Sequence, residues 1–121
     1  MLFDPFTKNP VTAVWHEDNW KRWRPLLTQS DYDAIQEEMH KRLDVQEFFN
    51  TSWEPGHEWE DPFYPIYEAV GQNELKAKLF WGLIAQVTIM EHPLDFGFKK
   101  NEKLDGDREP GTTYFRIERD A

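Results

Sequence analysis

The sequence contains no cysteine among its 121 residues, and this absence excludes several classes of protein. Without thiols there is no disulfide framework, no thiolate zinc site and no cysteine nucleophile. Since the sequence holds nothing that requires an oxidising compartment, we expect a cytoplasmic protein.

Long apolar runs are also missing. The longest apolar stretch, residues 79–90, is interrupted by Gly82, Gln86 and Thr88, and it is shorter than the ~20 residues that a membrane span needs. Residues 1–6 lack the basic start and apolar run of a signal peptide. We therefore expect no membrane association, and we expect residues 1–10 to be loosely ordered.

The motifs of common enzymes are absent too. The sequence has no glycine-rich phosphate loop, no nucleophile elbow and no closely spaced histidine pair. We expect a non-catalytic protein without a cofactor or a metal ion. One alternative stays open, a metal-dependent enzyme in which His16 and His57, with their neighbouring acids, converge on one ion.

Aromatic residues, by contrast, are abundant. The 9 Phe, 6 Trp and 4 Tyr make up 16% of the chain, whereas all hydrophobic residues together reach only 39%. Because each large ring buries more area than an aliphatic side chain, these rings can fill one core. The length suits a single domain over residues 1–121.

Three segments show a helical pattern. In residues 31–44, Tyr32, Ile35, Met39 and Leu43 recur at spacings of three and four, and an extension to Phe49 stays open. Residues 50–60 suggest an irregular loop, and Asp61 with Pro62 then suggests the start of a short helix that ends near Gly71. Residues 74–91 follow Asn73, an N-cap residue, and are so apolar that we expect a central helix.

After Pro93 the period changes to two. Phe96 and Phe98 alternate, as do Thr113, Phe115 and Ile117, around a Gly- and Asp-rich turn. This pattern predicts an antiparallel hairpin with strands at 95–103 and 112–119, and it leaves open a third short strand near residues 12–15. The fold class is therefore α+β: a mainly α-helical single domain with a C-terminal antiparallel β-hairpin. The helix-then-hairpin order is winged-helix-like at most.

The net charge of −9 is concentrated in one part of the chain. Residues 31–61 hold ten acids and two bases, so eight net negative charges lie there and the other 90 residues carry only −1. Such a surface attracts basic partners. Aromatic side chains interleaved with charge are typical of interface anchors. The candidate partner-binding residues are Asp33, Glu37, Glu38, Asp44, Glu47, Trp53, Glu54, Glu58, Trp59 and Glu60.

We therefore hypothesise a small acidic protein that engages a basic, nucleic-acid-processing protein. In its sharper form the acids imitate nucleic-acid phosphates and inhibit the partner, a principle shared by small acidic anti-restriction, anti-CRISPR and nuclease-immunity proteins. The alternative is that these acids form only a solvated helix face and a polar loop, without a partner. Whether Trp53 and Trp59 face a partner or the core separates the two.

A nucleic-acid-binding regulator is the competing hypothesis. In residues 20–24, Lys21, Arg22 and Arg24 offer charges for phosphates, and Trp20 and Trp23 offer rings for stacking. The hairpin lysines would add to this surface, although acids balance them. If this segment is helical, however, the two indoles share one face with Leu27, which is the spacing of a helix packed on the core.

Overall fold

Helices come first along the chain and most of the sheet comes last. The computed structural model describes residues 1–45, 48–50, 59–100 and 112–117. The helices are α1 (Glu17–Trp23), the short 3-10 helix η1 (Arg24–Leu26), α2 (Gln29–Val45), α3 (Tyr64–Ala69) and α4 (Glu74–Glu91). The strands are β1 (Phe48–Asn50), β2 (Phe96–Lys100) and β3 (Thr112–Arg116). The predicted α+β class with a C-terminal antiparallel hairpin is confirmed.

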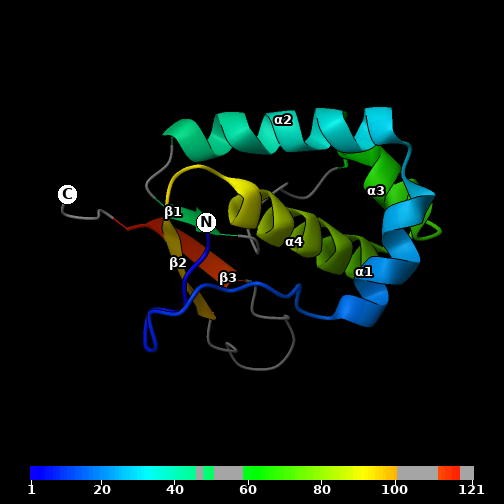
Figure 1. Cartoon of the computed structure of the whole chain (residues 1–121). Coiled ribbons are helices and arrows are strands. Elements are labelled where there is room, and N and C mark those ends of the chain that lie inside the picture. Colours follow the sequence, from blue (N-terminus) through cyan, green and yellow to red (C-terminus); the bar gives the residue numbers. More distant parts are fainter. Residues whose placement is uncertain (46–47, 51–58, 101–111, 118–121) are drawn as a thin grey trace, which may run out of the picture.

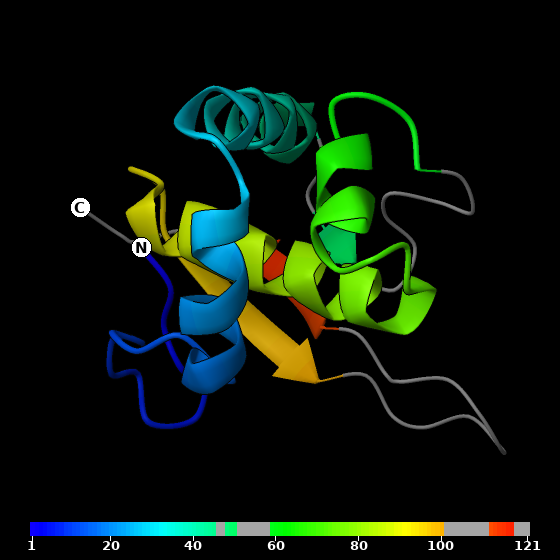
Figure 2. The same ribbon diagram turned by 90° about the vertical axis from the view of Figure 1, so that its right-hand side faces the viewer.

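Helix α4 lies at the centre of the molecule. Figures 1 and 2 show α2 on one side of it, the sheet on the other, and α1 and α3 at its flanks. Its start is fixed by the Asn73 side chain, which accepts a hydrogen bond from the Lys76 amide over 3.1 Å. Ten of its residues are buried, including the polar Gln86 and Thr88. The predicted central helix over 74–91 is thus confirmed.

Helix α2 covers α4 with the predicted apolar stripe. Tyr32, Ile35, Met39 and Leu43 are all buried. The helix is capped by Thr28, whose Oγ1 accepts from the Asp31 amide over 3.0 Å. It ends at Val45, so the extension to Phe49 is wrong.

The short helix α3 begins later than the sequence predicts. Pro62 precedes the helix, Phe63 is the N-cap residue, and it is Pro65 that lies in the first turn, where a missing amide leaves no helical bond unmade. Gly71 follows the helix with φ of 69°, a left-handed conformation that glycine adopts without steric cost.

The sheet contains the predicted hairpin and one further strand. Its order is β1-β3-β2, and both pairs are antiparallel. The third strand comes from Phe48–Asn50, inside the predicted helix extension and loop, and not from residues 12–15, which the structure describes without a strand. Residues 13 and 15 are instead held by buried Gln86, whose amide accepts from the Trp15 amide and donates to the Ala13 carbonyl.

One face of the sheet is covered by α4, and the other face is partly exposed to solvent. Phe49 pairs with Tyr114, and both side chains are 1% exposed on the face toward α4, where Phe49 stacks on Trp81. Neighbouring strand residues point to opposite faces, so Phe48 and Phe115 lie on the outer face. Phe48 is 64% exposed there.

The N-terminal segment lies along the free edge of β2. The Phe3 amide donates to the Phe96 carbonyl over 2.8 Å, and the Phe96 amide donates to the Met1 carbonyl over 2.8 Å. The Leu2 side chain is fully buried. These bonds satisfy backbone groups that an open edge would leave unpaired.

Candidate partner-binding surface

The acids of α2 follow from its amphipathic pattern. Because the apolar stripe faces α4, Asp33 and Glu37 are exposed on the opposite side, and Glu38 is half-buried between the two sides. Asp31 is a fourth acid in this part of the helix. The first half of α2, residues 29–38, thus holds four acids and no base. This end of α2 is therefore the most negative part of the described helices.

Two bases further along α2 pair with its acids. Lys41 Nζ lies 3.9 Å from Glu37 Oε1, and Arg42 Nε lies 3.5 Å from Glu38 Oε1. The Lys41–Glu37 pair is exposed, and exposed pairs are worth only ~0–1 kcal/mol, so a partner's arginine or lysine can replace Lys41 at little cost. Asp33 accepts instead from the neutral amide of Gln29, over 2.7 Å, and its charge is not offset by that contact.

Arg42 also connects α2 to the turn that precedes α3. Its guanidinium lies over the Phe63 ring, 4.9 Å from the centroid. The Phe63 amide donates to the Glu60 carbonyl over 2.8 Å, and Glu60 and Asp61 are both exposed. The turn that contacts α2 through Phe63 therefore carries two more exposed acids. We define the acidic surface by its exposed or half-exposed acids, which are Asp31, Asp33, Glu37, Glu38, Glu60 and Asp61.

Two of the predicted site residues have other surroundings. Asp44 is exposed near the end of α2 and lies beside His92, not within the acidic surface. Trp59 is half-buried and stacks on Tyr67 of α3, with centroids 5.8 Å apart and planes at 13°. Trp59 thus packs the 59–63 turn against the domain. The remaining predicted residues, Glu47, Trp53, Glu54 and Glu58, lie outside the described residues.

The basic segment packs inward. Trp23 is buried against Phe80, and the Trp20 ring lies 6.2 Å from that of Tyr32 and 6.3 Å from that of Phe80. The interpretation as a core-packed helix face fits both indoles, and Leu27 is buried with them.

The bases of this segment have partners within the chain. Arg24 lies over the Tyr32 ring at 3.7 Å and donates to the Gln29 amide oxygen over 2.9 Å. Lys21 pairs with Glu17 at 3.0 Å. Two of the three bases that could contact phosphates are therefore engaged at α1 and at the start of α2.

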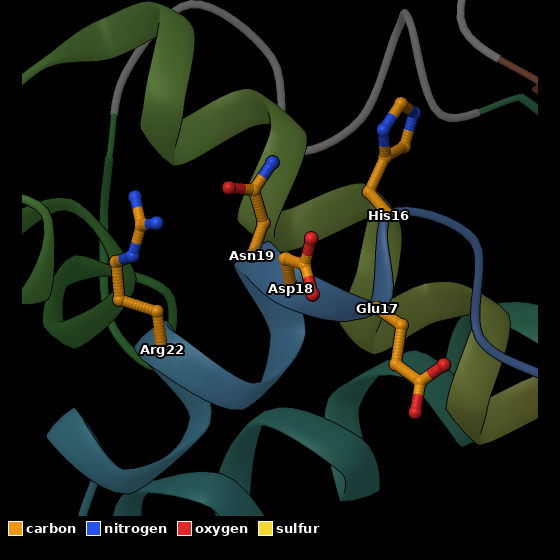
Figure 3. A pocket seen from close by; sticks show the side chains of 5 residues that line it. All are labelled: His16, Glu17, Asp18, Asn19 and Arg22. Carbon is orange, nitrogen blue, oxygen red and sulfur yellow. The ribbon is translucent and has the colours of Figure 1, made fainter.

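The described residues around His16 do not assemble a metal site. His16, Glu17, Asp18, Asn19 and Arg22 line an open depression at the start of α1. In Figure 3 the His16 and Glu17 side chains point to opposite sides. Among the residues that the structure describes, no group of three or more His, Asp or Glu side chains could hold a metal ion. His57, the proposed second ligand, is not one of those residues.

A second cluster of ionisable groups, which no sequence motif indicates, lies toward the other end of α2. The rings of His40 and His92 have centroids 5.1 Å apart, and Asp44 Oδ1 lies 3.8 Å from His92 Nε2. Burial, followed by the proximity of His40, holds the pKa of His92 below its ordinary value of 6.5. The two histidines are distant in sequence, and no local spacing signals their contact.

No helix in the described part of the chain has both the length and the apolar character that crossing a bilayer would require. Comparisons with protein-family models, with curated proteins and with solved structures find no match to this chain.

Proposed function

We propose that this protein is a non-catalytic binding protein that engages a basic, nucleic-acid-processing protein through its acidic surface. The observation that carries the proposal is the run of four acids without a base in the first half of α2, of which Asp33 and Glu37 are exposed. Inhibition of the partner by imitation of phosphates is the sharper form of the proposal.

Rigidity supports a binding role for this helix. The stripe of four buried side chains fixes α2 on α4, and the Thr28 cap fixes its first turn. Asp33 and Glu37 are one turn apart, which brings residues on a helix surface to within about 6 Å of each other. Such a preformed row of charges steers association and loses little conformational entropy on binding.

The inward packing of Trp20 and Trp23 favours a protein partner over direct nucleic-acid binding. A single-strand binder needs its rings open for stacking and its bases open for phosphates. With a net charge of −9, the chain as a whole also repels phosphates. We propose a cytoplasmic location, because nothing in the cysteine-free sequence points to an oxidising compartment.

Affinity capture from the source cells tests this proposal. The bait variant D33K/E37K/E60K reverses three acids of the acidic surface. The control variant D18K/E68K/E74K makes the same change of charge at exposed acids outside that surface. We expect a basic protein to be retained by the wild-type chain and by the control, and to be lost with the first variant.

Two results would contradict the proposal. Loss of the partner with both variants would mean that net charge, and not this surface, governs binding. Retention of nucleic acid alone, sensitive to salt and with no protein captured, would favour the competing hypothesis of a nucleic-acid-binding regulator.

A further inference from the structure

His92 lies where four segments of the fold meet. It caps the C-terminus of α4, and its side chain is only 4% exposed. Its ring is tilted against His40 of α2 and meets Phe96 of β2 edge-on, at a centroid distance of 5.2 Å. Its carbonyl accepts a hydrogen bond from the Met1 ammonium, and so does the carbonyl of Leu94. His92 therefore ends α4 and contacts α2, β2 and the N-terminal segment.

The hydrogen bonding of His92 shows which of its ring nitrogens carries the proton. The Leu94 amide donates to His92 Nδ1 over 3.0 Å. Since an amide N–H can only donate, Nδ1 must carry a lone pair, and the single ring proton is on Nε2, the atom that lies 3.8 Å from Asp44 Oδ1. A second proton would have to occupy Nδ1, where it would replace the acceptor of the Leu94 bond with a donor.

The charges around the ring add to this effect. His40 on α2, the Met1 ammonium and Arg116 on β3 all disfavour a cationic His92, and among the described residues Asp44 favours it. Arg116 itself donates to the carbonyls of Leu43 and Asp44 at the end of α2, over 2.9 and 3.4 Å. Asp44 offsets this weakly, because its side chain is 64% exposed to solvent.

We infer that His40 and His92 form an acid-sensitive latch between the C-terminal half of α2 and the turn that follows α4. At neutral pH the uncharged His92 ring packs closely on His40 and the Leu94 bond is intact. As the pH falls below the ordinary histidine value of about 6.5, protonation of His92 breaks that bond and places a cation beside His40, the Met1 ammonium and Arg116, all of which disfavour it. The end of α2 then separates from the turn, while the rest of α4 stays packed.

A titration of the histidine ring protons by NMR tests the latch. We expect His92 in the wild-type protein to titrate below pH 6.5. H40N removes a neighbouring positive charge and should raise the midpoint of His92. D44N removes a neighbouring charge that favours the cation and should lower that midpoint further. H16N alters a histidine that lies at the start of α1 and should leave it unchanged. A midpoint of 6.5 or higher, or one that H40N does not raise, would overturn the inference.

Amide hydrogen exchange tests the opening itself. Between pH 7 and pH 5, after correction for the intrinsic exchange rate, protection of the Leu94 amide should fall by up to tenfold per pH unit, and Ile84 in the middle of α4 should keep its protection. H92N retains an acceptor near the Nδ1 position but takes up no proton, so it should abolish this loss. If H92N fails to fold, the same measurement in H40N decides, since its loss should begin at a higher pH. Uniform loss across α4, or no loss at Leu94, would contradict a local latch.

Discussion

The absence of a side chain at Gly97 allows the Phe115 ring to lie on the backbone of β2 on the outer face of the sheet. The two residues are paired in the register of β2 and β3. A Cβ at Gly97 would lie 2.6 and 2.7 Å from Cε2 and Cζ of Phe115 and 3.2 Å from Cδ1 of Ile117. In G97A the ring must rotate away from its rotamer and from the strand, which costs about 1–2 kcal/mol of the free energy of unfolding.

G82A is the matched control for this substitution. A Cβ at Gly82 meets nothing within 4 Å, and the residue lies inside α4. Alanine should therefore stabilise the protein by about 0.5–1 kcal/mol, because it restricts the unfolded chain without a clash. Urea-induced unfolding followed by circular dichroism measures both effects.

A double-mutant cycle separates the steric cause from other effects of G97A. If the clash with the ring is responsible, G97A should lose most of its cost when Phe115 is already alanine. A neutral or stabilising G97A in the wild-type background would refute the close packing of Phe115 on β2. An undiminished cost in the F115A background would refute the ring as its cause.

Three further perturbations have defined outcomes. N73A removes the cap of α4 and should lower the free energy of unfolding by about 1 kcal/mol. N73D keeps an acceptor oxygen and should retain most of the wild-type stability, and urea unfolding measures both variants. Burial raises the pKa of Tyr32 to about 12 and that of Tyr114 still further, so stability should be full below pH 10 and fall above it; an ultraviolet absorbance titration should show these two tyrosines ionising late. Because the pKa of His92 is lowered by folding, its contribution to stability should be full above about pH 6.5 and fall in more acidic solution by at most about 1.4 kcal/mol per pH unit, and H92N should flatten that part of the stability curve.

Local patterns were enough to predict the two long helices. The four apolar residues of α2 recur at helical spacing, and all four are buried. Asn73 marks the start of α4 by a side-chain bond within its own first turn. Both signals are contained in fewer than twenty consecutive residues, so the sequence alone shows them.

Strand β1 escaped prediction for the opposite reason. Phe48 and Phe49 come shortly after an amphipathic helix in the sequence, and two consecutive aromatic residues fit the end of a helix as well as a strand. What selects the strand is pairing with Phe115 and Tyr114, far along the chain, and stacking of Phe49 on Trp81. Propensity is overridden here by packing that no short window contains.

The sequence likewise predicted the local features of the candidate surface and not its tertiary contacts. Exposure of Asp33 and Glu37 follows from the apolar stripe on the other side of α2. The Arg42 contact with Phe63, which joins α2 to the turn that carries Glu60, depends on the tertiary fold. The contact of Trp59 with Tyr67 joins residues only eight apart, but in an irregular segment without a period to reveal it.

The proposal that the acidic surface binds a basic protein is tested most directly by the affinity of the purified chain for the captured partner, measured by titration calorimetry at low and at physiological salt. The account predicts that D33K/E37K/E60K weakens binding at least tenfold, that D18K/E68K/E74K changes it much less, and that salt weakens the wild-type complex. Equal affinities for the two variants, or binding of the wild-type chain that salt does not weaken, would contradict it.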